Sequence, residues 1–93
     1  MTKGKLSNLK DLEKYFKGVA NHWRIDILIV ISKNPGINLD QISQKLDCNI
    51  KTLSEHSRRL SHSGLVFKKY KDRFVEHYLS KEGKHFIDFI KSF

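Results

Sequence analysis

The chain has 93 residues, a length that suits one small domain and predicts a single unit over residues 1–93. Its single cysteine excludes an intramolecular disulfide framework and indicates a reducing, cytoplasmic setting. The longest apolar run, Ile27–Ile31, is too short to span a bilayer, and the first residues lack the apolar region of a signal peptide, so membrane insertion is not expected.

The formal net charge is +8, with 18 Lys and Arg against 10 Asp and Glu. Much of it is concentrated between Lys51 and Arg73, where seven basic residues face two acidic ones. A focused basic region of this kind is typical of proteins that bind nucleic acid. The alternative is the ordinary solvated surface of a basic protein.

Two helices are expected before the first strong turn signal. The first runs from about Asn8 to Gly18, and the second begins after Asn21 and ends near Lys33, before Asn34-Pro35-Gly36. Apolar residues recur at helical spacing in both segments. The expected buried stripes are Leu9, Leu12, Phe16 and Val19 in the first helix, and Ile25, Leu28, Ile29 and Ser32 in the second.

Residues 38–66 have the pattern of two short amphipathic helices joined by a tight turn. Asn38 and Gln41 are spaced for a capping box, and Asp47-Cys48-Asn49 breaks the helical pattern before a second helix that Gly64 ends. The expected inward faces are Leu39, Ile42 and Leu46 in the first of these helices, and Ile50, Leu53, Ser57 and Leu60 in the second. The outward face of the second helix holds Lys51, Thr52, Glu55, Arg58, Arg59 and His62.

The period then changes to that of strands. Leu65–Tyr70 and Arg73–Leu79 are predicted to form a hairpin with Lys71-Asp72 at its tip. Ser80 is placed to cap a last helix, in which Gly83 permits a close approach to a neighbouring segment. The predicted fold class is therefore mainly α with a small β-hairpin.

The order of these elements is that of a winged helix-turn-helix domain with about five helices and a two-stranded wing. Several segments resemble the ArsR-type winged-helix transcriptional repressors, whereas residues 79–84 are similar to the strand-to-helix junction of MarR-type and PadR-type regulators. The segments that carry the ArsR resemblance are Ala20–Leu28, Thr52–His56 with Arg58 and Leu60, Gly64-Leu65-Val66, and the hairpin with Arg73 and Val75.

This resemblance implies a homodimeric repressor whose recognition helices enter successive major grooves of DNA while the wings contact the backbone or the minor groove. Thr52 and Ser54 suit base edges or phosphates, whereas Glu55 either accepts a hydrogen bond from cytosine or pairs with a neighbouring arginine. Basic side chains suit phosphates. The candidate DNA-binding residues are Lys51, Thr52, Ser54, Glu55, His56, Arg58, Arg59, Lys69, Lys71 and Arg73.

The apolar stripes of the first and last helices are broader than a small core requires. We expect these helices to pack together and to extend into a homodimer interface, as in the family; the alternative is that they only cover the core of the monomer. The candidate interface residues are Leu9, Leu12, Phe16, Val19, Phe86, Phe89, Ile90 and Phe93.

Two positions depart from the family pattern. Ser57 stands where a core leucine is expected, so that either a large neighbour such as Trp23 or Phe67 fills the space or the site is loosely packed. Asp72 replaces a glycine at the wing tip, which alters the expected turn.

No metal, cofactor or catalytic site is expected. Residues 37–40 lack the paired cysteines of the arsenic and cadmium sensors, and His85 with Asp88 lacks the further ligands of a zinc site. Cys48 is interpreted as a small buried residue, with a redox switch as the alternative. No pattern for nucleophilic or acid–base catalysis is evident, so an enzyme is not expected. The rival function is a basic winged-helix module that binds protein partners or RNA.

Overall fold

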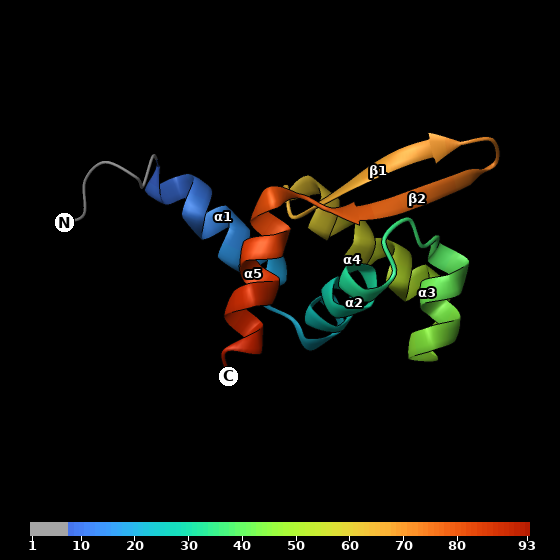
Figure 1. Cartoon of the computed structure of the whole chain (residues 1–93), viewed down its shortest axis with the longest axis horizontal. Coiled ribbons are helices and arrows are strands. Elements are labelled where there is room, and N and C mark those ends of the chain that lie inside the picture. Colours follow the sequence, from blue (N-terminus) through green and yellow to red (C-terminus); the bar gives the residue numbers. More distant parts are fainter. Residues whose placement is uncertain (1–7) are drawn as a thin grey trace.

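The computed structural model describes residues 8–93, over which five helices and a two-stranded antiparallel sheet follow one another (Figure 1). This confirms the predicted winged helix-turn-helix fold. In Figure 1 the hairpin projects at one end of the molecule and the first helix lies at the other. The elements are α1 (Leu9–Val19), α2 (His22–Lys33), α3 (Leu39–Leu46), α4 (Ile50–His62), β1 (Val66–Lys71), β2 (Phe74–Leu79) and α5 (Lys81–Lys91).

Each helix begins at a polar side chain that accepts hydrogen bonds from the otherwise unpaired backbone N–H groups of its first turn. The capping box predicted for α3 is confirmed: the Gln41 backbone N–H donates to Asn38 Oδ1 at 2.9 Å, and the Asn38 N–H donates to Gln41 Oε1 at 3.0 Å. The other caps are Asn8 for α1, Asn21 for α2, Asn49 for α4 and Ser80 for α5. The helix starts are thus encoded locally.

Helix α2 forms the centre of the core. The predicted stripe was wrong in detail, because Ile25 and Ile29 are only half-buried, whereas Ile27 and Ile31 are almost fully buried. The reason is that α2 packs against every other helix and against β2, and a helix surrounded in this way buries apolar residues around most of its circumference. The other core residues are Val19, Leu28, Val30, Ile37, Ile42, Cys48, Leu53, Leu60, Leu65, Val66, Leu79 and Ile87.

The wing is a hairpin with a two-residue turn. Its register pairs Val66 with Leu79 at the base and Lys71 with Phe74 at the tip, so the turn is Asp72-Arg73, one residue later than predicted. Asp72 adopts the left-handed conformation, with φ of 57°. Aspartate tolerates this conformation better than most residues, which lets it stand where glycine was expected.

A buried histidine ties the wing to the segment between α2 and α3. The backbone N–H and Nδ1–H of His77 both donate to the Ile37 carbonyl at 3.0 Å, and the Gly36 N–H donates to the His77 carbonyl at 2.9 Å. Burial of the ring lowers the pKa of His77, and the positive charge of Lys68 acts in the same direction. His77 therefore favours the neutral state when the protein is folded.

Acid is expected to destabilise the fold through His77. Because its pKa is lower in the folded than in the unfolded protein, its contribution to stability is complete above the unfolded value, about 6.5, and is lost as the pH falls through the folded value. Replacing His77 by Asn keeps a donor near the Nδ1 position and removes this titration. Urea unfolding at pH 5 and pH 7 should show a smaller pH difference for His77→Asn than for wild type.

The matched control is His85→Asn, which replaces an exposed histidine on α5. This variant should keep the wild-type pH difference. His56 also has a lowered pKa, caused first by burial. It should therefore contribute the same pH dependence to the free energy of unfolding in wild type and in both variants. An unchanged pH difference in His77→Asn would assign the acid sensitivity to other groups.

Helix α5 starts unusually close to β1. A Cβ built on Gly83 would lie 2.2 Å from the Leu65 carbonyl oxygen, which confirms the predicted close approach. The same segment is held by Ser80, whose N–H donates to the Leu65 carbonyl at 3.0 Å and whose hydroxyl donates to the Gly64 carbonyl at 2.6 Å. In the part of the chain that the structure describes, none of the helices has the length and apolarity needed to cross a membrane.

Candidate nucleic-acid interface

The turn between α3 and α4 fixes how α4 leaves the body of the protein. Asp47, at the end of α3, is left-handed, with φ of 50°. The Ser43 hydroxyl donates to the Cys48 carbonyl at 2.6 Å, and Asn49 Oδ1 accepts from the Lys51 backbone N–H at 2.8 Å. The Cys48 side chain is buried within this turn. The two helices therefore form a helix-turn-helix whose connection is held by side-chain and backbone hydrogen bonds.

The inner face of α4 holds Leu53, Ser57 and Leu60, all buried. Ile50 was also expected there but is 44% exposed, because it is the first residue of the helix and lies beyond the core. The Ser57 hydroxyl is buried and has no hydrogen-bond partner among the described residues. Phe67 does not belong to the core beside it, since its ring is partly exposed and stacks on Tyr78.

The outer face of α4 is exposed along its whole length. Lys51, Thr52 and Ser54 lie exposed near its N-terminal end, which is the end that enters the major groove in helix-turn-helix proteins. Thr52 and Ser54 present hydroxyl groups that donate and accept hydrogen bonds. This end of the helix therefore offers the chemistry needed to contact base edges and phosphates.

Glu55 pairs with two arginines on the same face. Its Oε2 lies 2.7 Å from Arg58 Nη2 and 3.1 Å from Arg59 Nε. The hydrogen bond from Arg58 lowers the pKa of Glu55, and Glu55 in turn raises the pKa of Arg58. Of the two roles left open by the sequence, pairing along the helix is the one that the structure contains.

His56 differs from its neighbours on α4. It is half-buried, and its Nδ1 has no hydrogen-bond partner among residues 8–93. Burial lowers the pKa of His56, and the positive charges of Arg24 and Arg59 add to this effect. This side chain lies at the edge of the recognition face and favours the uncharged form.

The wing presents exposed basic side chains at its tip. Lys71 and Arg73 are exposed there, whereas Lys69 Nζ lies 5.2 Å from the centre of the Tyr78 ring, nearer the base. Two exposed aromatic residues that the candidate list did not include, Tyr70 and Phe74, also lie close to the tip. Strand alternation alone does not identify them, because it does not show how far the wing extends beyond the core.

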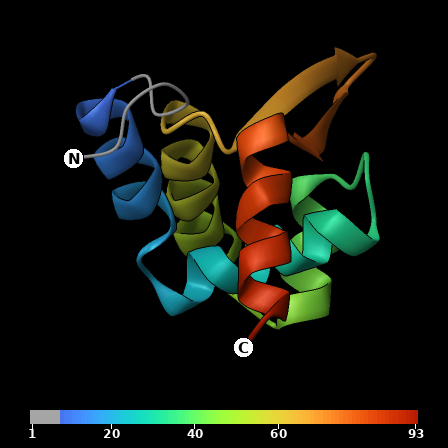
Figure 2. The ribbon, with the colours of Figure 1, turned by 60° about the vertical axis from the view of Figure 1, so that its left-hand side comes forward.

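The terminal helices contact each other through aromatic rings. The rings of Phe16 on α1 and Phe86 on α5 meet edge to face with centroids 5.0 Å apart. Within the C-terminal segment, the ring of Phe89 on α5 meets that of Phe93, with centroids 5.1 Å apart. Figure 2 shows α5 in front of the bundle, with α1 beside α4. Large apolar side chains remain exposed on α1, on α5 and just after α5: Leu9, Phe16, Phe89 and Phe93.

Two residues of these helices correct the predicted interface. Val19 is buried in the core, because α1 ends against the rest of the domain, and is therefore not available to a partner. In α5 the buried apolar residue is Ile87, which was not part of the predicted stripe. The exposed aromatic residues lie on other faces of that helix.

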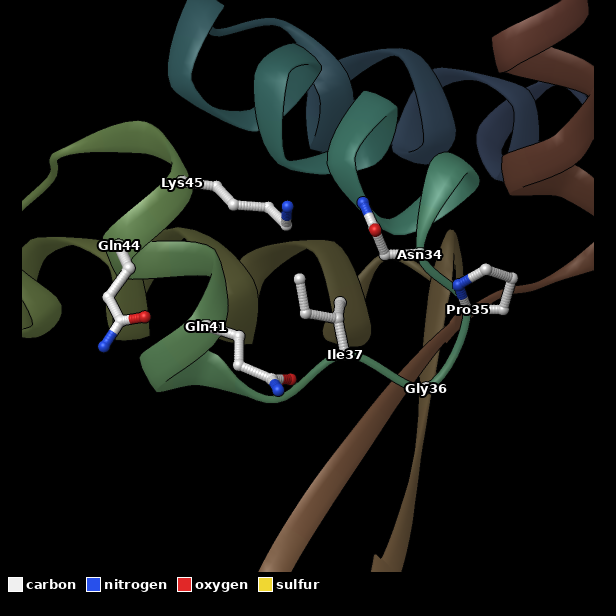
Figure 3. Close-up of a pocket in the computed structure, with 7 residues that line it drawn as sticks. All are labelled: Asn34, Pro35, Gly36, Ile37, Gln41, Gln44 and Lys45. Carbon is white, nitrogen blue, oxygen red and sulfur yellow. The ribbon is translucent and has the colours of Figure 1, made fainter.

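A polar hollow lies beside the helix-turn-helix. It is lined by Asn34–Ile37 and by Gln41, Gln44 and Lys45 of α3, with a volume of about 540 Å³. Figure 3 shows Lys45 extending across it towards α2, whereas Gln44 points away. Among residues 8–93, no group of three or more His, Cys, Asp and Glu side chains is arranged to hold a metal ion.

Comparison with protein families matches residues 22–66 to a family described as winged helix-turn-helix DNA-binding. A comparison with curated protein sequences gave no match. The matched segment runs from α2 to the start of β1 and therefore includes the whole helix-turn-helix.

Solved structures extend the likeness to most of the chain. HlyU from Vibrio cholerae N16961 is 27% identical with a TM-score of 0.81, and the match covers 91% of this chain and 92% of that one. The transcriptional regulator HlyU from Vibrio vulnificus CMCP6 is 29% identical, with a TM-score of 0.75 and coverage of 91% and 96%.

A third structure shares the fold at lower identity. It is a homodimeric winged helix-turn-helix domain from Mycobacterium bovis, described as a possible ArsR-family regulator, with 17% identity, a TM-score of 0.83 and coverage of 99% and 85%. Together with the family match, these structures confirm the resemblance to ArsR-type regulators.

Proposed function

We propose that the chain, whose residues 22–66 match a family described as winged helix-turn-helix DNA-binding and whose fold is similar to that of ArsR-type regulators, is a sequence-specific transcriptional regulator that acts as a homodimer. The recognition helix is α4, which enters the major groove, and the basic tip of the wing contacts the backbone or the minor groove. Residues 1–93 act as one domain in this proposal.

The observation that carries the proposal is the exposed outer face of α4. Lys51, Thr52 and Ser54 lie at its N-terminal end and leave hydroxyl and ammonium groups free for DNA, while Leu53 and Leu60 fix the opposite face in the core. A winged helix that binds proteins has no need for a basic recognition face. The same face argues against the alternative of a module that binds protein partners.

The proposed dimer is supported by the exposed aromatic residues of α1 and α5. Phe93 is 91% exposed and Phe89 is 50% exposed, which is unfavourable for large apolar side chains in a monomer. The Mycobacterium bovis domain of the same fold is described as homodimeric. A two-fold dimer would place two recognition helices on one face of a duplex. Such a dimer bound at a promoter would repress transcription by blocking access to that DNA.

The proposal is tested by selecting bound duplexes from a random pool and measuring their affinity as a function of salt. A palindromic consensus with half-sites about one helical turn apart is expected, together with affinity that falls steeply as salt increases. Equal, weak and salt-insensitive binding of selected and random duplexes would refute DNA recognition. Preferential binding of single-stranded or structured RNA would support the alternative function.

Two single substitutions separate affinity from specificity. Arg73→Ala at the wing tip should weaken binding to all duplexes and reduce the slope of log K against log salt by about 2, because the dimer loses one phosphate contact in each protomer. Thr52→Ala should instead change the ratio of affinities for selected and random duplexes, with a slope close to wild type. Fluorescence anisotropy with both duplexes measures the two quantities. Identical behaviour of the two variants would contradict the assigned roles.

A further inference from the structure

A second basic surface lies between α1 and α4, mostly outside the residues assigned above to DNA. This α1–α4 groove has a volume of about 430 Å³. Its basic lining residues are Lys10, Lys14, Lys17, Arg24, Arg58 and Arg59. Glu13 is the one acidic residue among the described side chains that line it.

The positive charge of the groove is incompletely neutralised. Glu13 pairs with Lys17 at 3.2 Å, and Glu55 outside the groove pairs with both arginines of α4. Within residues 8–93, no ion pair is formed by Lys10, Lys14 or Arg24. A groove with this excess of positive charge concentrates anions from solution.

Arg24 adds a second indication of a missing partner. Its Nε is buried and donates to no acceptor among the described residues. A buried guanidinium N–H without an acceptor is costly, and a negative charge in the groove that Arg24 lines would offset part of that cost electrostatically. The neighbouring His56 ring has a lowered pKa, caused by burial and then by the positive charges of Arg24 and Arg59, which is consistent with a local excess of positive charge.

The position of the groove favours the DNA backbone as the source of the anion. Arg58 and Arg59 line the groove and also belong to the outer face of α4, so the two surfaces are continuous. Figure 1 places α1 and the wing at opposite ends of the molecule, whose longest dimension is 45 Å. At about 3.4 Å per base pair, that length corresponds to about 13 base pairs.

We propose that the α1–α4 groove binds phosphate groups of the DNA backbone, on the side of the recognition helix opposite to the wing. Lys10, Lys14 and Arg24 supply the contacts, and Arg58 and Arg59 link the groove to the major-groove site. This inference rests on the proposed function. It adds contacts that are independent of sequence, so the groove contributes affinity and orientation.

The test is the double variant Lys10→Gln/Lys14→Gln, with Lys81→Gln/Lys84→Gln as the control. Both pairs are exposed, and both replacements remove two positive charges, but Lys81 and Lys84 lie on α5 outside the groove. On the selected duplex, the groove variant should reduce the slope of log K against log salt by about 4, because the dimer loses two phosphate contacts in each protomer at about 0.9 per contact. The control should change the slope by much less.

A free anion gives a further readout. Equal slopes for the two double variants, in a wild type that binds DNA with normal salt dependence, would overturn the inference and leave the proposed function intact. Loss of inorganic tripolyphosphate binding in the groove variant, with an unchanged DNA slope, would also overturn it, because the groove would then hold a free anion. A wild type without salt-dependent DNA binding would refute the proposed function itself.

Discussion

Replacing Gly83 by Ala should destabilise the protein by about 3 kcal/mol or more. An alanine in a helix normally stabilises it relative to glycine by up to about 1 kcal/mol. Here the added Cβ would lie 2.2 Å from the Leu65 carbonyl oxygen, a backbone atom that no rotamer change can move away. The overlap is relieved only by displacing α5 from the start of the wing, which costs more than the helix propensity gains.

Thermal unfolding followed by circular dichroism measures this effect. A loss of about 3 kcal/mol corresponds to a fall in Tm of about 12 °C or more for a domain of this size. Lys84→Ala, at the next position of α5, is the control, since Lys84 is exposed and the change should leave Tm nearly constant. A Tm of Gly83→Ala within a few degrees of wild type would show that α5 is free to shift.

The double variant Phe89→Glu/Phe93→Glu should convert the proposed dimer to a monomer. Burying one phenylalanine contributes about 1.5–3 kcal/mol, so the loss of two from each protomer should raise the dissociation constant more than a hundredfold. Four added carboxylates near a two-fold axis would also repel each other. The monomer should remain folded, because Phe93 is 91% exposed and Phe89 is 50% exposed.

Sedimentation equilibrium at micromolar concentration is the measurement. Tyr70→Glu/Phe74→Glu provides the control, because these exposed aromatic residues lie on the wing, away from α1 and α5. The control should sediment as a dimer. A wild type that is monomeric, or a Phe89→Glu/Phe93→Glu protein that remains dimeric, would exclude this face as the interface.

The parts of the fold that depend on neighbouring residues were predictable from the sequence. The capping box at Asn38 and the left-handed Asp47 are determined within a few residues, and the structure contains both. The inner face of α4 followed from helical spacing for the same reason, except at its first residue, Ile50, where the core no longer covers the helix.

The parts that depend on tertiary packing were less predictable. The sequence does not show that α2 is enclosed by the other helices, so its buried residues did not follow one stripe. The turn of the wing lies one residue later than predicted, because Lys71 pairs with Phe74 across the hairpin and leaves Asp72-Arg73 as the loop. In the candidate site, the basic face of α4 was predictable, whereas the groove it shares with α1 depends on how two distant segments meet.

The pairing of Glu55 with Arg58 and Arg59 has a consequence for the proposed complex with DNA. Its carboxylate oxygens occupy the positions in which both guanidinium groups would otherwise hold a phosphate. A DNA phosphate that binds Arg58 or Arg59 would therefore have to displace the Glu55 carboxylate from their guanidinium groups. This competition would lower the affinity for all DNA sequences equally. The proposed base contacts of Thr52 and Ser54 would then supply a larger fraction of the total binding free energy, and with it the discrimination between specific and non-specific genomic sites.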